Sequence, residues 1–189
     1  MLRKSAALWP VLLLCLISVP GCKTDPNRQL LKALKNQDVE AIYDALGRGA
    51  NLHTKGELSA GVLTFAVVRD ASRVTGLLIQ SGADVNQPAN RGYTPLMCAA
   101  FLGKDEMVKF LHQNGAKLDL KDADGDTAVV WALLGGNRTT ADSLVDAGAD
   151  PASREEYFQK YGQYSLQKLE KLTTMTALLE TTGWKRKDE

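Results

Sequence analysis

The nine residues Gly-Tyr-Thr-Pro-Leu-Met-Cys-Ala-Ala, at positions 92–100, carry the strongest structural signal in the chain. Thr94 is followed directly by Pro95, and a threonine hydroxyl can accept a hydrogen bond from the first turn of a helix. Proline suits the first helical position, because the N–H that it lacks would have no partner there. Ala99 and Ala100 are small enough to let a neighbouring helix approach closely. The stretch therefore predicts a tightly packed helix that begins at Pro95.

A fixed period extends from this stretch along the chain. Each apolar, helix-like segment is followed by a Gly-Ala pair, where glycine can take the left-handed conformation that ends many helices. Four such pairs occur at intervals of 33 residues, at 49–50, 82–83, 115–116 and 148–149. A period of this length is typical of repeat proteins, in which each unit buries its apolar face against the next one.

The repeat resembles the ankyrin repeat, most closely at 91–123 and also at 124–156, which begins Gly-Asp-Thr-Ala. The resemblance is weaker at 58–90, where Gly-Val-Leu replaces Thr-Pro-Leu. It implies an all-α solenoid of stacked helix–turn–helix units with short β-turn tips. The expected units are an N-terminal capping unit at 30–57, repeats at 58–90, 91–123 and 124–156, degenerate C-terminal capping helices at 157–184 and a charged tail at 185–189.

The C-terminal segment lacks the repeat signature but keeps helical periodicity between Glu155 and Trp184. Its apolar residues follow helical spacing: Leu166, Leu169, Leu172, Met175, Leu178 and Leu179. End units of solenoids diverge because one of their faces must meet water. We therefore expect these helices to cap the array.

The N-terminus has the features of a bacterial lipoprotein signal peptide. Basic residues precede an apolar stretch from Ala6 to Val19, which is too short to span a membrane. It ends in Val-Pro-Gly-Cys, which resembles a lipobox with Cys22 as the lipidated residue, although Pro20 departs from the usual small residue. We expect 1–21 to be removed and 22–29 to form a short tether; the alternative is an ordinary signal peptide cut near the glycine.

Composition argues against several classes of protein. A formal net charge of +1 over 189 residues offers no reason to expect nucleic-acid binding. No run of 18 apolar residues indicates a membrane span. Three cysteines cannot form a disulfide framework, and Cys98 falls at a normally buried position of the repeat, so we expect a buried and unreactive thiol.

By resemblance, a protein partner would dock on the concave face, which the turn tips and the exposed side of each first helix line. Position by position, this selects Leu58, Val68, Arg69, Asn90, Arg91, Tyr93, Phe101, Leu102, Asp124, Asp126 and Leu134. We expect an apolar stripe anchored by Tyr93 and Phe101, with aspartate tips beside it. The alternative is that Phe101 and Leu102 pack on the adjacent repeat.

Catalytic and metal-binding patterns are weak. His53 and His112 are the only histidines, and they lie one or two repeats apart, so we expect structural or surface groups and not a catalytic pair. The alternating aspartates from Asp122 to Asp126 lack the glycine and closing acid of a calcium loop, so we expect a solvated acidic tip. We expect no catalysis, metal, cofactor, small-molecule substrate or nucleic acid, and a monomer.

Together these features predict a protein-binding module that is lipid-anchored in the bacterial cell envelope, in the outer membrane and facing the periplasm. Lys23 favours the outer membrane, because the resemblance to lipoproteins associates retention in the inner membrane with aspartate there. The partner could be a toxin that this protein neutralises or a periplasmic enzyme that it supports. The alternative is a scaffolding lipoprotein of the envelope without one specific partner.

Overall fold

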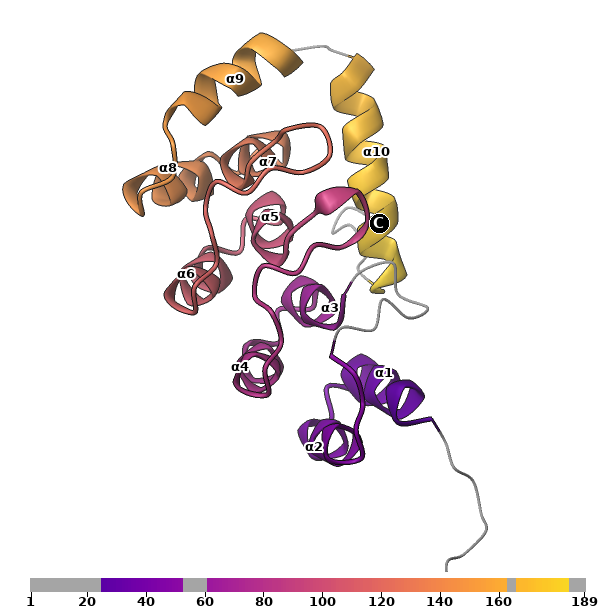
Figure 1. Ribbon diagram of the computed structural model, residues 1–189. Coiled ribbons are helices and arrows are strands. Elements are labelled where there is room, and N and C mark those ends of the chain that lie inside the picture. The colour runs from indigo at the N-terminus through magenta and orange to yellow at the C-terminus, as the bar shows by residue number, and fades with distance from the viewer. Residues whose placement is uncertain (1–24, 53–60, 163–165, 184–189) are drawn as a thin grey trace, which may run out of the picture.

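The computed structural model describes residues 25–52, 61–162 and 166–183, and these residues form α-helices and one short 3-10 helix, with no strand (Figure 1). The helices are α1 (Pro26–Asn36), α2 (Val39–Gly47), α3 (Val62–Val68), α4 (Ser72–Gln80), the 3-10 helix η1 (Asn90–Gly92), α5 (Pro95–Phe101), α6 (Asp105–Gln113), α7 (Ala128–Leu134), α8 (Arg138–Asp146), α9 (Ala152–Tyr161) and α10 (Leu166–Thr181). The prediction of an all-α repeat solenoid is confirmed.

The first eight α-helices form two layers (Figure 1). In one layer α3 packs against α1 and α5, and α5 packs against α7; in the other, α6 packs against α8. The first-layer helices have neighbours on several sides, which explains why their sequences, such as Val-Leu-Thr-Phe-Ala-Val-Val in α3, are apolar nearly all round. All seven residues of α3 are buried.

The start of α5 has the geometry expected from Thr94 and Pro95. The Thr94 hydroxyl accepts a hydrogen bond from the backbone N–H of Met97 at 3.2 Å, and Pro95 is the first helical residue. The cap therefore satisfies one of the backbone N–H groups that a helix start leaves without a partner.

Thr94→Ala removes this cap. We expect it to lower the free energy of unfolding by about 1 kcal/mol, because the buried Met97 N–H loses its acceptor. Urea denaturation followed by circular dichroism measures the loss. Thr139→Ala, at an exposed position of α8, is the control and should change stability by less than about 0.5 kcal/mol. Equal losses in the two variants would contradict the capping role.

The repeats are also joined by side chains that bond to the end of the preceding first helix. Lys104 Nζ donates to the carbonyl of Val68 at 2.8 Å, and Asn137 Nδ2 donates to the carbonyl of Phe101 at 2.7 Å. Both donors and both acceptors are 33 residues apart, so this is one device used twice. It satisfies carbonyl groups that helix ends leave free.

Two helices begin away from the unit boundaries expected from the sequence. α1 begins at Pro26, four residues before the predicted unit at 30, because the Asp25 side chain accepts from the Asn27 N–H at 3.0 Å and caps the helix there. α9 begins at Ala152, inside the span predicted for the last repeat. Residues 1–24, with Cys22, lie outside the described residues. No helix in the described part of the chain is long and apolar enough to cross a membrane.

Cys98 is fully buried in α5, as expected, and burial raises the pKa of its thiol to about 12. The thiolate is the reactive form of cysteine, so the raised pKa and the lack of solvent access both make Cys98 unreactive. We expect Cys98 in the folded protein to resist alkylation by iodoacetamide at pH 8 and to react fully in urea. Mass spectrometry of the peptide that contains Cys98 measures both states; rapid alkylation of the folded protein would contradict the buried position.

Candidate functional site

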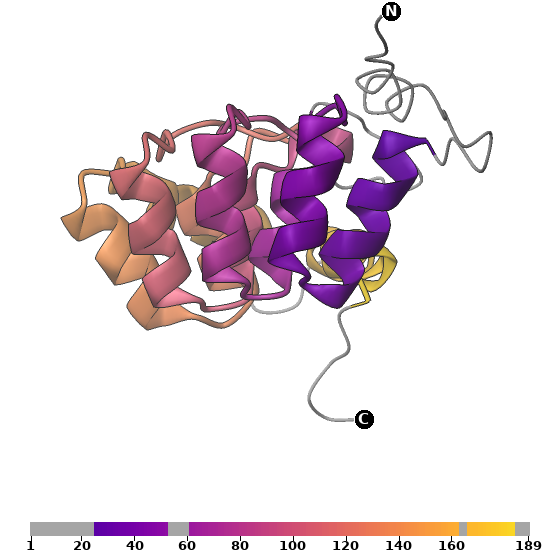
Figure 2. The same ribbon diagram turned by 90° about the horizontal axis from the view of Figure 1, so that it is seen from below.

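Helix α10 crosses the array instead of extending it. In Figure 1 α10 is seen lengthwise beside repeat helices that are seen end-on, and in Figure 2 the relation is reversed. Its 16 residues make a helix of about 24 Å. Lys171, near one end, contacts Trp131 of α7, whereas a Cβ on Gly183, just past the other end, would lie 3.3 Å from Nη1 of Arg69. α10 therefore runs along the stacking direction from the fourth unit to the second.

The two faces of α10 differ sharply. The inner face is buried and consists of Lys171, Met175, Leu178, Leu179 and Thr182, the last just beyond the helix end. The outer face is exposed and consists of Glu170, Thr173, Ala177 and Glu180. The helix thus turns its apolar stripe to the array and a polar, small-residue surface to water.

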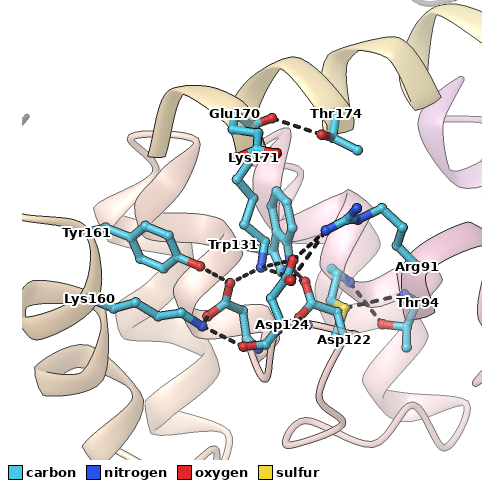
Figure 3. Close-up of polar contacts among 12 residues, drawn as sticks. Arg91, Thr94, Asp122, Asp124, Trp131, Lys160, Tyr161, Glu170, Lys171 and Thr174 are labelled. Carbon is cyan, nitrogen blue, oxygen red and sulfur yellow. Dashed lines mark hydrogen bonds and ion pairs between the residues drawn. The ribbon is translucent and has the colours of Figure 1, made fainter. Parts of the chain in front are cut away.

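Lys171 projects from this inner face into a cluster of three carboxylates (Figure 3). We call Asp122, Asp124 and Asp126 the aspartate cluster. Lys171 Nζ lies 2.9 Å from Oδ2 of Asp122 and 3.2 Å from Oδ2 of Asp124, and it also contacts Oδ2 of Asp126. The ammonium group is 5.0 Å from the centre of the Trp131 ring, within range of a cation–π interaction.

Burial alone would lower the pKa of Lys171, but its hydrogen bonds to Asp126 and Asp122 outweigh burial and raise the pKa above the ordinary value. These bonds therefore favour the charged form of Lys171.

The turn that carries the aspartate cluster is built around Asp122. Its Oδ1 accepts the backbone N–H groups of Asp124 and Asp126, both at 2.9 Å, and its Oδ2 accepts from Nε1 of Trp131 at 3.0 Å. Asp122 and Asp126 are buried. The expectation of a solvated acidic tip is therefore wrong for these two residues, because α9 and α10 cover them.

Asp126 also ties α9 to the cluster. It accepts from the hydroxyl of Tyr161, which is buried, and its Oδ1 is 3.0 Å from Lys160 Nζ. Burial, together with the hydrogen bond to Asp126, raises the pKa of Tyr161 and keeps its hydroxyl protonated as a donor.

Arg91 completes the cluster from the tip of the preceding unit. Its Nη2 lies 3.0 Å from Oδ2 of Asp124. Burial raises the pKa of Asp124, but bonds from Arg91 and Lys171 outweigh that effect, and the net shift is downward. Lys171, Lys160 and Arg91 together match the three negative charges of the aspartate cluster.

The exposed docking face predicted from the sequence is wrong at several positions. The residues that are buried instead of exposed are Val68, Tyr93, Asp126 and Leu134. Tyr93 packs edge-on against Trp131 with 5.1 Å between ring centres. Phe101 also packs edge-on against Trp131, at 5.8 Å, and is half-buried, which is the alternative in which it packs on the adjacent repeat.

The remaining predicted site residues fall into three groups. Asn90, Arg91 and Asp124 are exposed at the turn tips. Arg69 and Leu102 are half-buried, with Arg69 over the Phe65 ring. Leu58 and His53 lie outside the described residues. His112 is exposed on α6, remote from the aspartate cluster.

Lys171, Trp131 and Tyr161 were not predicted as site residues. The sequence pattern could have indicated Lys171, because it shares helical spacing with Met175 and Leu178 and is a single charge within an apolar stripe. The three aspartates converge on this ammonium group. Among the described residues no group of three or more histidine, cysteine, aspartate or glutamate side chains could hold a metal ion.

Comparison with known proteins agrees with this architecture. A family model of ankyrin repeats, in three copies, matches residues 22–122 and 63–155. The chain belongs to the ankyrin repeat family. Ankyrin repeats are generally a non-catalytic protein-interaction fold, although proteins that contain them can carry enzymatic domains elsewhere.

Curated relatives match this chain over part of their own length. An ankyrin repeat-containing protein of Treponema pallidum is 31% identical over 126 residues, which are 66% of this chain and 42% of that protein. The E3 ubiquitin-protein ligase hecd-1 of Caenorhabditis elegans is 31% identical over 104 residues, 54% of this chain and 4% of the ligase. Neurogenic locus notch homolog protein 1 of Xenopus tropicalis is 30% identical over 118 residues, 61% of this chain and 5% of the relative. The chain spans less than half the length of each.

Proposed function

We propose that this ankyrin repeat protein is a lipid-anchored protein-binding module of the bacterial cell envelope. The observation that carries the proposal is the array itself: stacked ankyrin units with charged turn tips. The T. pallidum relative is bacterial and also contains ankyrin repeats. The lipobox-like sequence that ends in Cys22 supports the anchor.

The position at which α1 begins limits the distance between the array and a lipid anchor at Cys22. Only three residues separate Cys22 from Pro26, the first residue of α1. A fully extended chain spans at most about 3.6 Å per residue, so the helix would begin within roughly 15 Å of the lipidated cysteine. The N-terminal unit would lie against the outer-membrane surface, with the array extending into the periplasm.

Lipidation is tested directly at Cys22. Protein purified from bacterial membranes should begin at Cys22 and carry the mass of its acyl chains, because two or more chains anchor firmly. Cys22→Ser should lose the modification and leave the membrane fraction, while circular dichroism remains unchanged. Cleavage at another residue, with no lipid on Cys22, would contradict the anchor and support the ordinary signal peptide.

We propose that the partner docks on the turn tips and on the face that α10 crosses. Asn90, Arg91 and Asp124 are exposed there and offer charged and amide groups to a partner. Arg91 already holds Asp124 in position through the 3.0 Å ion pair. The partner is a periplasmic protein, either an incoming toxin or a resident enzyme.

Crosslinked capture from detergent-solubilised membranes tests docking. Asn90→Ala/Arg91→Ala should recover at least about tenfold less of the specific partner than the wild type, because arginine is often a dominant interface residue. Gln80→Ala/Arg73→Ala removes the same chemistry from exposed positions of α4 and serves as the matched control. Equal recovery with both variants would contradict docking at the tips.

A further inference from the structure

We propose that α10 occupies the partner site and that the partner enters as a helix that replaces α10, placing one lysine or arginine in the aspartate cluster. This inference rests on the proposed function and names the kind of partner. We call the surface under α10 the α10 seat; it comprises the aspartate cluster, Trp131 and the end of α3 at Arg69.

The charges of the α10 seat require a cation from whichever helix occupies it. Without α10, the aspartate cluster keeps three negative charges, while Arg91 and Lys160 supply two positive ones. The empty seat therefore carries a net charge of −1, and Asp122 and Asp126 lie at its base. A helix without a cation would cover a carboxylate that has no matching charge, which is costly in a buried site.

The spacing along α10 describes the replacing helix. Met175, Leu178 and Leu179 follow Lys171 by four, seven and eight positions and share its buried face. A partner helix with a lysine or arginine, followed by apolar residues at these intervals, would place the same kinds of side chain on the seat as α10 does. Acidic or small residues suffice on its outer face, as Glu170 and Ala177 show.

α10 is attached differently from the repeat helices. α5 has six buried residues of seven and packs on α3, α6 and α7, whereas the described side chains of α10 are fully buried along one face only. Elements with few buried contacts open at lower free energy than the core of the same protein. α10 can therefore leave while the stacked units stay folded.

A cavity beside Lys171 gives an incoming helix a first point of contact. Its volume is about 300 Å³, and it is open to solvent between α9, α10 and the tip of η1. Its lining includes Arg91, Lys160, Glu170 and Thr174. Lys171 and Asp124 line it as well, so the ion pair that joins α10 to the aspartate cluster borders this open cavity.

Native-state hydrogen exchange on the full-length wild type tests whether α10 opens by itself. After correction for intrinsic rates, amides of α10 should exchange at least about a hundredfold faster than amides of α5 and α7, with a weaker dependence on urea. Equal protection of α10 and α5, with the same urea dependence, would overturn the inference, because α10 would then be an inseparable part of the core.

A peptide of residues 166–183 tests what the seat accepts. The acceptor is the full-length Lys171→Met protein, whose own helix lacks the cation but whose aspartate cluster is intact. The peptide should bind at least about tenfold tighter than the same peptide with Lys171→Met, measured by fluorescence anisotropy. Full-length Lys160→Met protein keeps Lys171 in place and should bind neither peptide. Equal affinity of the two peptides, or no binding of either, would overturn the cation requirement.

The experiments can contradict the proposed function and the replacement of α10 independently of each other. Loss of partner capture in the tip variants concerns docking of a cellular protein, whereas exchange and peptide binding concern the α10 seat alone. If both proposals hold, the peptide of residues 166–183 should also displace the partner captured by the full-length Lys171→Met protein, and the peptide with Lys171→Met should not. A partner that stays bound at saturating peptide would overturn the assignment of the seat as its site.

Discussion

Replacing Lys171 with methionine is expected to lower the free energy of unfolding by about 3–5 kcal/mol, the usual cost of removing one partner from a buried ion pair. Methionine keeps the length and apolar character of the side chain, so the loss reports the missing charge. The aspartate cluster would retain a carboxylate without a matching cation at the base of the site. Urea denaturation by circular dichroism measures the loss, and hydrogen exchange should show it first in α10.

Lys160→Met is the matched control, because Lys160 also pairs with Asp126, at 3.0 Å. The Lys160 side chain is 30% exposed and that of Lys171 only 5%. In Lys160→Met, water can therefore replace much of the interaction that the ammonium group of Lys160 makes. We expect a loss of less than about 1 kcal/mol. Lys171→Met/Asp126→Asn restores the charge balance and should recover part of the deficit. Similar losses for the two lysines would contradict a buried charge cluster.

Gly135→Ala is expected to destabilise the protein by about 3 kcal/mol, near the upper end for overpacking a core. A Cβ at this position would lie 2.1 Å from the carbonyl oxygen of Phe101 and 2.8 Å from Nδ2 of Asn137. The φ of Gly135 is −73°, which alanine adopts without strain. The cost therefore comes from pushing α7 away from the end of α5, where Asn137 holds the Phe101 carbonyl.

Gly47→Ala provides the opposite case. Gly47 is the last residue of α2, and a Cβ there would meet no atom within 4 Å. Alanine loses less conformational entropy on folding than glycine, so we expect a gain of about 0.4–1 kcal/mol. Urea denaturation by circular dichroism measures both glycine variants. A tolerated Gly135→Ala would show that the repeats can separate at this contact without cost, contrary to the close approach.

The repeat units could be predicted because their signals are local. The cap at Thr94, the first-turn position of Pro95 and the buried thiol of Cys98 all depend on residues within a few positions of each other. The 33-residue period then repeats the same solution. Glycine at the end of each unit marks where the chain must take a left-handed conformation, as Gly115 does with a φ of +91°.

The binding face could not be predicted in the same way. Tyr93 occupies a position that the ankyrin pattern leaves on the concave side, yet it is buried against Trp131 from the next unit. Asp122 looks like a surface residue in the sequence, but it accepts three hydrogen bonds from residues of the following unit. Burial at these positions depends on which element covers the turn, and the turn sequence does not contain that element.

The sequence by itself determined the array: its period, the ends of its helices, its apolar layers and the buried thiol of Cys98. Only the tertiary structure decided where α10 lies. The amphipathic stripe of α10 requires some apolar surface, but several surfaces of the solenoid could satisfy it. The choice is made by Lys171 and Asp126, which are 45 residues apart. A buried ion pair forms only where the folded chain brings its two charges together, and no local sequence pattern specifies that long-range contact.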